Sequence, residues 1–220
     1  MHPVLPWKGR SWTGLNAFQN DEAVPVGRID PDVIDAARSL LGSVLLSSVE
    51  GSLCAGVIVE TEAYGGMDDP ASHAATRHGP TPRNRVMFGP AGLAYVYQSY
   101  GVHWCVNVVT GAEGSAGAVL IRGLDPLFGM EAMSTRRQGR TPLGAGPGRL
   151  CQAMGVTGEL NGHDLAEEPL RLLTGWAIED PRIGVSPRIG IRRAAHWPNR
   201  FYVRGARGVS RPDGWSPPAV

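Results

Sequence analysis

Lysine is almost absent from this chain of 220 residues, and Lys8 is the only one. An enzyme that forms a Schiff base needs an amine as its nucleophile. Lys8 and the amino terminus are the only amines of this kind, and Lys8 lies in a segment without secondary-structure periodicity. The composition therefore argues against catalysis by an amine.

Cysteine and long apolar runs are also scarce. Cys54, Cys105 and Cys151 form no C-x-x-C pair, so we expect neither a disulfide framework nor a zinc ribbon. No apolar stretch approaches the ~20 residues that span a bilayer, and the first residues lack the apolar core of a signal peptide. These absences predict a soluble, cytoplasmic protein, and 220 residues suit one domain with its own core.

The formal net charge is only +1, yet the arginines are unevenly distributed. Residues 132–158 contain four arginines and no acid, and residues 181–220 contain eight arginines and one acid. Clustered arginines are typical of surfaces that bind phosphate, although ordinary solvated charge gives the same pattern. The first cluster is Arg136, Arg137, Arg140 and Arg149, and the second is Arg182, Arg188, Arg192, Arg193, Arg200, Arg204, Arg207 and Arg211.

Apolar periodicity predicts a domain that mixes helices with strands. Helices are expected over 30–42, from Asp125-Pro126 through Arg137, and from Gly146-Pro147 to Gly155. Strands are expected over 43–48, 53–64, 94–99, 102–109 and 118–124, with a turn at 50–51. Tyr100-Gly101 is expected at a tight hairpin tip between two of these strands.

The strand expected over 53–64 carries unusual polar residues. Alternation of period two places Glu60, Glu62 and Tyr64 on one face. Two carboxylates and a phenol on one face suit a catalytic site, although they also suit a solvated strand surface. Loops after strands are where sites are commonly built. The following loops add Asp68, Asp69, His73, His78, Arg83, Asn84 and Arg85.

Some of these loop residues suggest a metal-dependent hydrolase as one hypothesis. Carboxylate oxygens suit hard divalent ions, and histidine suits zinc. The spacing follows no H-E-x-x-H or comparable ligand pattern, so the hypothesis depends on residue type alone. The four candidate ligands are Asp68, Asp69, His73 and His78.

A series of motifs gives the chain a specific resemblance. E-T-E-A-Y, G-x-x-D-x-A-x-H, T-P-R-N-x-x-M-F and Y-V-Y-x-x-Y-G-x-x-x-C-x-N follow one another between residues 60 and 107. V-L-I-R-G-L-D-P, G-P-G-R-L-C-Q-A and R-F-Y-V-R-G come later. With these motifs, roughly residues 27–205 resemble the alkyladenine (3-methyladenine) DNA glycosylases.

The resemblance implies roles for individual residues. Glu62 matches the carboxylate that activates water, with Glu60 as an alternative acid or structural partner, and Arg122 matches an arginine near that water. Tyr64, His73, Tyr97 and Asn107 match the pocket for a flipped base. Tyr100, beside Gly101 at the hairpin tip, matches the residue that enters the minor groove of DNA. Arg83 and Arg149 are expected to contact DNA, Arg149 together with the amides of a helix N-terminus.

The resemblance also implies a fold and a function. We expect a single α+β domain over 26–205 with a curved, mainly antiparallel sheet, flanking helices and a protruding hairpin. Residues 1–25 and 206–220 are expected to be extensions. The expected enzyme excises alkylated or deaminated purines from double-stranded DNA as a monomer, with no cofactor and, because lysine is scarce, no lyase activity. A protein that binds lesions without cutting them is the alternative outside enzymes.

Overall fold

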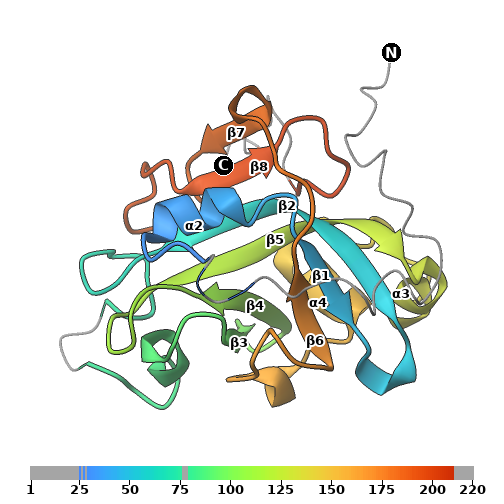
Figure 1. Ribbon diagram of the computed structural model, residues 1–220, viewed down its shortest axis with the longest axis horizontal. Coiled ribbons are helices and arrows are strands. Elements are labelled where there is room, and N and C mark those ends of the chain that lie inside the picture. Colours follow the sequence, from blue (N-terminus) through green and yellow to red (C-terminus); the bar gives the residue numbers. More distant parts are fainter. Residues whose placement is uncertain (1–24, 26, 28, 76–78, 211–220) are drawn as a thin grey trace.

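The computed structural model describes residues 25, 27, 29–75 and 79–210, which form one α+β domain. An eight-stranded sheet curls into a half-barrel, and every strand pair in it is antiparallel (Figure 1). The strand order is β3-β4-β5-β2-β1-β6, with β8 paired to β2 and β7 paired to β8. The strands are β1 (Val44–Ser47), β2 (Cys54–Tyr64), β3 (Ala94–Ser99), β4 (His103–Val109), β5 (Ala118–Phe128), β6 (Leu170–Leu173), β7 (Ile183–Ser186) and β8 (Arg200–Val203).

β2 is the central strand of the sheet. One edge pairs with β5, and the other pairs first with β1 and then with β8. Both faces of β2 are covered, so every residue of the strand except the last is buried. The Thr61 hydroxyl donates to the Ala37 carbonyl, at 2.7 Å, which places Thr61 on the side of α2 (Val33–Ser39). Glu60 and Glu62 therefore lie on the opposite face, by alternation.

Short helices cover both sides of this sheet. α2 begins where the Asp32 side chain accepts hydrogen bonds from the amides of Ile34 and Asp35, and it packs on β2 and β5 (Figure 1). α4 (Pro147–Met154) lies behind the sheet in Figure 1 and packs on β4 and β5. α3 (Met130–Arg136) packs against α4. The 3-10 turns are η2 (Val49–Gly51), η3 (Arg85–Phe88), η4 (Gly158–Leu160) and η5 (Asp180–Arg182).

The antiparallel sheet with flanking helices is confirmed, and the helix expected to end near Arg137 is present as α3, but its expected start at Asp125 is wrong. β5 continues through Phe128, and its backbone pairs with the start of β2. Gly129, with a φ of 74°, then turns the chain into α3. The Asp125 carboxylate does not cap a helix, because it accepts a hydrogen bond from the Gly208 amide. Arg122 therefore lies in the middle of β5 rather than at its end.

The expected tight turn at the tip of the β3–β4 hairpin is present, with Tyr100 and Gly101 at its centre and the Val102 amide donating to the Ser99 carbonyl at 3.0 Å. Ser99 pairs with His103, which leaves Tyr100, Gly101 and Val102 outside the ladder. Tyr100 has a φ of 51° and Gly101 a φ of 68°. Positive φ is uncommon for a bulky residue and costs about 1–3 kcal/mol. The turn therefore holds an exposed tyrosine in an unfavourable conformation.

The chain beyond β8 packs against the sheet as far as it is described. Ala206 and Val209 are buried, and the Ser210 amide donates to Glu60 Oε2 at 2.6 Å. Residues 1–24 and 211–220, which make up most of the expected extensions, lie outside the described residues. No helix in the described part is long and apolar enough to cross a membrane.

Gly123 is expected to be essential to the packing of β5. A Cβ at this position lies 2.3 Å from the Gly208 carbonyl oxygen and 2.9 Å from Glu60 Cβ. Gly123→Ala should therefore destabilise the protein by about 1–3 kcal/mol, measured by urea denaturation. Gly27→Ala is the control, because a Cβ there meets nothing within 4 Å. Equal midpoints for the two variants contradict the close packing of residues 206–210.

Candidate active site

A cleft of about 1170 Å³ opens on the face of the sheet that carries Glu60 and Glu62. Aromatic side chains from β2, from the loop after it and from β3 line the cleft, together with the N-terminus of α4 and residues 189–191. Five arginines also line it, which makes the described wall strongly basic. The aromatic group is Tyr64, His73, Tyr95 and Tyr97, and the arginines are Arg83, Arg122, Arg137, Arg140 and Arg149.

Glu62 lies against this cleft and has no exposed surface. Its Oε2 accepts hydrogen bonds from the Tyr64 hydroxyl at 2.8 Å and from Arg122 Nη1 at 3.3 Å. Its Oε1 accepts from the Ile189 amide at 2.7 Å. Tyr64, Arg122 and Ile189 all line the cleft. The carboxylate is thus buried behind three of the groups that form the wall.

The surroundings of Glu62 act on its pKa in opposite directions. Burial raises the pKa of Glu62, and the nearby Glu60 charge raises it further. Arg122, the Ile189 amide and the Tyr64 hydroxyl lower the pKa of Glu62, and the net effect is a raised pKa. Burial and Glu62 raise the pKa of Tyr64, so this phenol stays protonated and donates. A carboxylate poised in this way can accept a proton from a substrate or water.

Glu60 is held by more partners than Glu62. Its Oε1 accepts from Arg200 Nε at 2.7 Å, Arg122 Nε at 3.2 Å and the Ser210 hydroxyl at 2.8 Å. The Ser210 amide donates to its other oxygen. Because its lone pairs are occupied by these partners, Glu60 has the contacts of a structural carboxylate. Arg122 bridges the two acids through different nitrogen atoms.

The aromatic wall of the cleft is a connected group. His73 Nδ1 lies 2.8 Å from the Tyr95 hydroxyl, and the His73 ring meets the Tyr97 ring edge to face at 4.5 Å. Burial and the charge of Arg83 lower the pKa of His73, which leaves the imidazole neutral at pH 7. The Asn107 amide donates to the Tyr95 carbonyl at 2.8 Å, and Asn107 also lines the cleft. The wall can therefore bind a flat ring by stacking.

The structure brings together most of the residues expected at a site. Gly101 lies outside the cleft lining, in the exposed turn beside Tyr100. Glu62 is in contact with the wall rather than part of it. The predicted residues that line the cleft are Tyr64, His73, Arg83, Tyr97, Tyr100, Asn107, Arg122 and Arg149.

Several participants were not predicted from sequence. The Ile189 amide is a main-chain group, so no side chain marks it. β8 and the residues after it bring Arg200 and Ser210 to Glu60, across 140 and 150 positions of sequence. Arg137, Arg140 and Arg200 were recognised only as members of arginine clusters.

The four residues proposed as metal ligands are not gathered in the described part of the chain. Asp69 is bound by Arg188, with Nη2 2.8 Å from Oδ1, and His73 is bound to Tyr95. Asp68 is exposed, and His78 lies outside the described residues. Within the described ranges, no group of three or more His, Cys, Asp or Glu residues could hold a metal ion.

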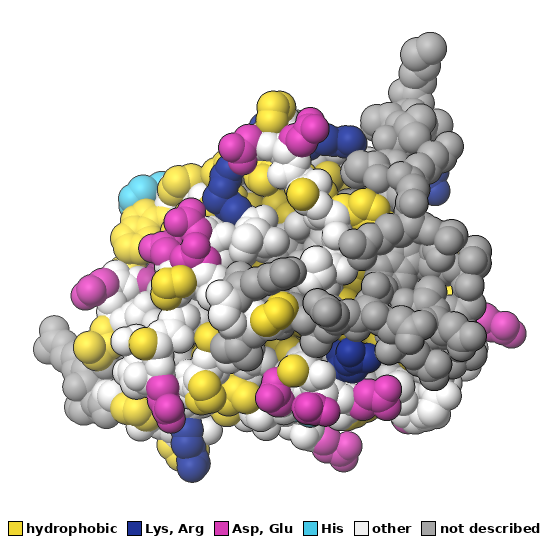
Figure 2. Space-filling model, in the orientation of Figure 1, with side chains coloured by type: hydrophobic (Ala, Val, Ile, Leu, Met, Phe, Trp, Pro, Cys, Tyr) yellow, Lys and Arg dark blue, Asp and Glu magenta, His cyan; other side chains and the backbone are white. Residues whose placement is uncertain are grey.

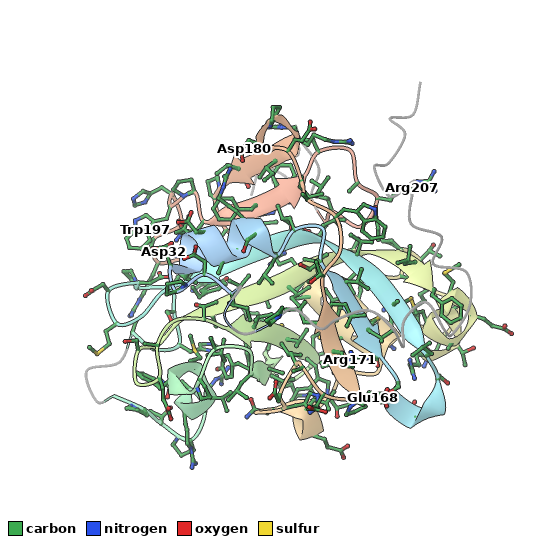
Figure 3. The ribbon with its side chains drawn as sticks, viewed as in Figure 1. Asp32, Glu168, Arg171, Asp180, Trp197 and Arg207 are labelled. Atoms are coloured by element: carbon green, nitrogen blue, oxygen red, sulfur yellow. The ribbon has the colours of Figure 1, made fainter. Side chains whose placement is uncertain are left out.

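The second arginine cluster is only partly a surface feature, so neither phosphate binding nor solvated surface charge describes all of its members. Arg188 and Arg200 are buried, in ion pairs with Asp69 and Glu60, and Arg211 lies outside the described residues. The opposite face of the sheet carries charges of both signs. Figure 2 shows acidic and basic side chains over its described part, and Figure 3 labels Asp32, Glu168 and Asp180 as well as Arg171 and Arg207 in the same view.

Comparisons with known proteins agree on one family. Residues 28–207 match the family model described as methylpurine-DNA glycosylase. The chain is similar to proteins named "Putative 3-methyladenine DNA glycosylase" from three organisms. It is 46% identical to that of Methanoculleus marisnigri over 193 residues, covering 86% of this chain and 98% of the relative. It is 51% identical to that of Rhodopseudomonas palustris strain HaA2, covering 82% of this chain and 86% of the relative. It is 47% identical to that of Agrobacterium fabrum, covering 86% of this chain and 92% of the relative.

The two buried carboxylates should contribute unequally to stability. Glu60→Gln removes the acid that binds Arg200 Nε and one of the two acids that bind Arg122, so it should destabilise the protein by about 3–5 kcal/mol. Glu62→Gln leaves Arg122 paired with Glu60. It also removes a carboxylate that burial disfavours in its ionised form, so the loss of stability should be clearly smaller. Urea denaturation of both variants measures the difference. A larger loss in Glu62→Gln contradicts this division.

Proposed function

The chain belongs to the methylpurine-DNA glycosylase family, and on that premise we propose that it flips a damaged purine out of duplex DNA and hydrolyses the N-glycosidic bond. The proposed substrates are alkylated or deaminated purines, and the product is an abasic site. One observation carries the proposal: a buried carboxylate, Glu62, held by three donors behind an aromatic cleft.

For an alkylated purine, which carries positive charge, the proposed reaction needs only water and Glu62, whereas a neutral deaminated purine must also gain a proton as it leaves. The water oxygen bonds to C1′ of the sugar while the bond from C1′ to the purine nitrogen breaks, and its electron pair leaves with the base. The Glu62 carboxylate accepts the proton of the water and stabilises positive charge that develops on the sugar. Arg122 supports the ionised form of Glu62, because its positive charge opposes the effect of burial.

Access to the carboxylate is consistent with this role. Both donors at Glu62 Oε2, the Tyr64 hydroxyl and Arg122, line the cleft. The contact from Arg122 is long, at 3.3 Å. Catalytic hydrogen bonds often tighten only when substrate binds. We propose that the attacking water approaches Oε2 between these two groups.

The aromatic wall accounts for the proposed substrate class. Tyr64 and Tyr97 line the cleft, and stacking on electron-rich rings favours a purine that carries positive charge. A neutral His73 can hydrogen-bond to the base, since burial and Arg83 keep its pKa low. Asn107, in the same wall, is proposed to disfavour bases with an additional amino group, above all undamaged guanine, which lacks the positive charge of 7-methylguanine.

We propose that Tyr100 fills the gap that a flipped nucleotide leaves in the duplex. Its side chain is 93% exposed, and its backbone is held at a φ of 51°. Strain of this kind is found at functional positions when surrounding structure enforces it. Arg83 and Arg149, at the cleft beside it, are proposed to contact DNA phosphates, and the protein is proposed to act as a monomer.

Base release by wild type and Glu62→Gln tests the function. With chelator present and a duplex containing one 7-methylguanine or hypoxanthine, wild type should release the base and Glu62→Gln should lose at least about 100-fold in rate. The strand should break only after alkali, because the scarcity of amines leaves little to form a Schiff base. Tight lesion binding without release by wild type would identify a recognition protein instead. Activity that chelator abolishes would favour the metal-dependent hypothesis.

Tyr100→Ala should slow base release from duplex DNA by at least about 10-fold, because unstacking a base step costs a few kcal/mol. Release from single-stranded DNA should change little, since no stack has to be opened. The thermal melt should match that of wild type, because the side chain is exposed. Unchanged release from the duplex disproves the proposed role of Tyr100.

A further inference from the structure

Arg188 is a buried cation beside the active site that the reaction proposed above does not use. Its side chain has 0% exposed surface. The guanidinium binds both oxygens of the Asp69 carboxylate, and Nη1 also donates to the Ala63 carbonyl at 2.8 Å. It lies over the Tyr64 ring, 4.7 Å from the centroid. One side chain therefore contacts the end of β2, the loop after β2 and the tyrosine that donates to Glu62.

The residue after Arg188 donates directly to the proposed base. The Ile189 amide lies 2.7 Å from Glu62 Oε1. A single peptide unit thus separates the Arg188 backbone from that hydrogen bond. Because the guanidinium is anchored on β2 and Asp69, it fixes the position of this segment relative to Glu62.

Asp69 connects the same cation to the loop that carries His73. Its two oxygens accept from the Gly65 amide and the Ala71 amide, each at 3.0 Å. Burial raises the pKa of Asp69, but Arg188 and these two amides outweigh it, so the net pKa is lowered. The carboxylate is therefore ionised across the pH range in which the enzyme is tested.

Stability alone is a weak reason for a buried ion pair. The cost of removing two charges from water offsets most of their attraction, and an apolar pair of similar size is often at least as stable. Arg188 also leaves its Nε without a hydrogen-bond partner, although that atom is buried in the described structure. Geometry explains the arrangement better, because a planar guanidinium binds a carboxylate, a carbonyl and a ring face at fixed relative angles.

We propose that Arg188 and Asp69 are positioning residues that hold the Ile189 amide and the Tyr64 hydroxyl on the Glu62 carboxylate. This inference rests on the proposed function, because it assumes that Glu62 is the base. Neither residue touches the reacting atoms. Their effect reaches the reaction through the two hydrogen bonds that they keep in place.

The Arg188–Asp69 pair should also affect how the rate of base release depends on pH. The charged and titratable groups that face Glu62 are Arg122, Glu60, Tyr64, Tyr97 and Cys105. The Ile189 amide lowers the pKa of Glu62, so loosening that amide raises the pKa. Base catalysis is lost as the pH falls through the pKa of Glu62. Loosening the amide therefore moves the acid limb of the rate profile to higher pH.

Arg188→Lys tests the inference. A lysine keeps the charge but cannot bind carboxylate, carbonyl and ring together. Single-turnover release of 7-methylguanine from a duplex is measured from pH 5 to 9, because this cationic base needs no acid to leave. The acid limb should move up by about one pH unit, which corresponds to a tenfold change in the ionisation equilibrium.

Arg136→Lys is the matched control. Arg136 is also mostly buried and donates to the Val49 and Ala153 carbonyls, but it does not line the cleft. This variant should lose thermal stability without moving the acid limb. Asp69→Asn should move the limb in the same direction as Arg188→Lys, and it decides the question if Arg188→Lys does not fold.

The outcomes separate the two proposals. An acid limb that matches wild type in folded Arg188→Lys or Asp69→Asn shows that the ion pair is only structural and overturns the inference. That result leaves the proposed function intact, provided that wild type releases base and Glu62→Gln does not. Full activity in Glu62→Gln overturns both, because Glu62 is then not the base.

Discussion

The structure depends on one buried guanidinium shared by two acids. Arg122, in the middle of β5, reaches Glu60 through Nε and Glu62 through Nη1, and both carboxylates lie on β2 without exposed surface. Two like charges on one strand face destabilise the sheet unless a cation lies between them. The long pairing of β2 with β5 keeps that cation in register. The antiparallel sheet is thus both the scaffold and the electrostatic support of the site.

The two carboxylates differ because their remaining partners differ. Glu60 is held by Arg200 and by two groups of Ser210, so its oxygens face protein donors. Glu62 shares its oxygens with Tyr64 and Ile189, both at the wall of the cleft. The close packing of β5 against Glu60 and residue 208 requires glycine at position 123, because a Cβ there has no room. We infer that stability and chemistry are divided between two neighbouring acids of the same strand.

The alternation of β2 was readable from the sequence, because period two alone places Glu60, Glu62 and Tyr64 on one face. The helix expected from Asp125 begins only at Met130, because pairing of residues 125–128 with β2 overrides the local capping signal. The sequence also could not distinguish arginines in buried ion pairs from arginines that line the cleft. Arg188 and Arg137 belong to similar clusters, yet one is paired with an acid 119 positions away and the other lines the cleft. Such partners depend on tertiary pairing, and composition cannot reveal them.

The central claim is that an ionised Glu62 faces the sugar carbon at which positive charge develops. Binding affinity for a duplex with a cationic pyrrolidine in place of the sugar, compared with a neutral tetrahydrofuran, measures this directly. A site that stabilises the transition state binds its charged analogue more tightly. Wild type should prefer the cationic duplex, and Glu62→Gln should lose this preference while still binding the neutral one. Equal preference in both proteins would contradict it.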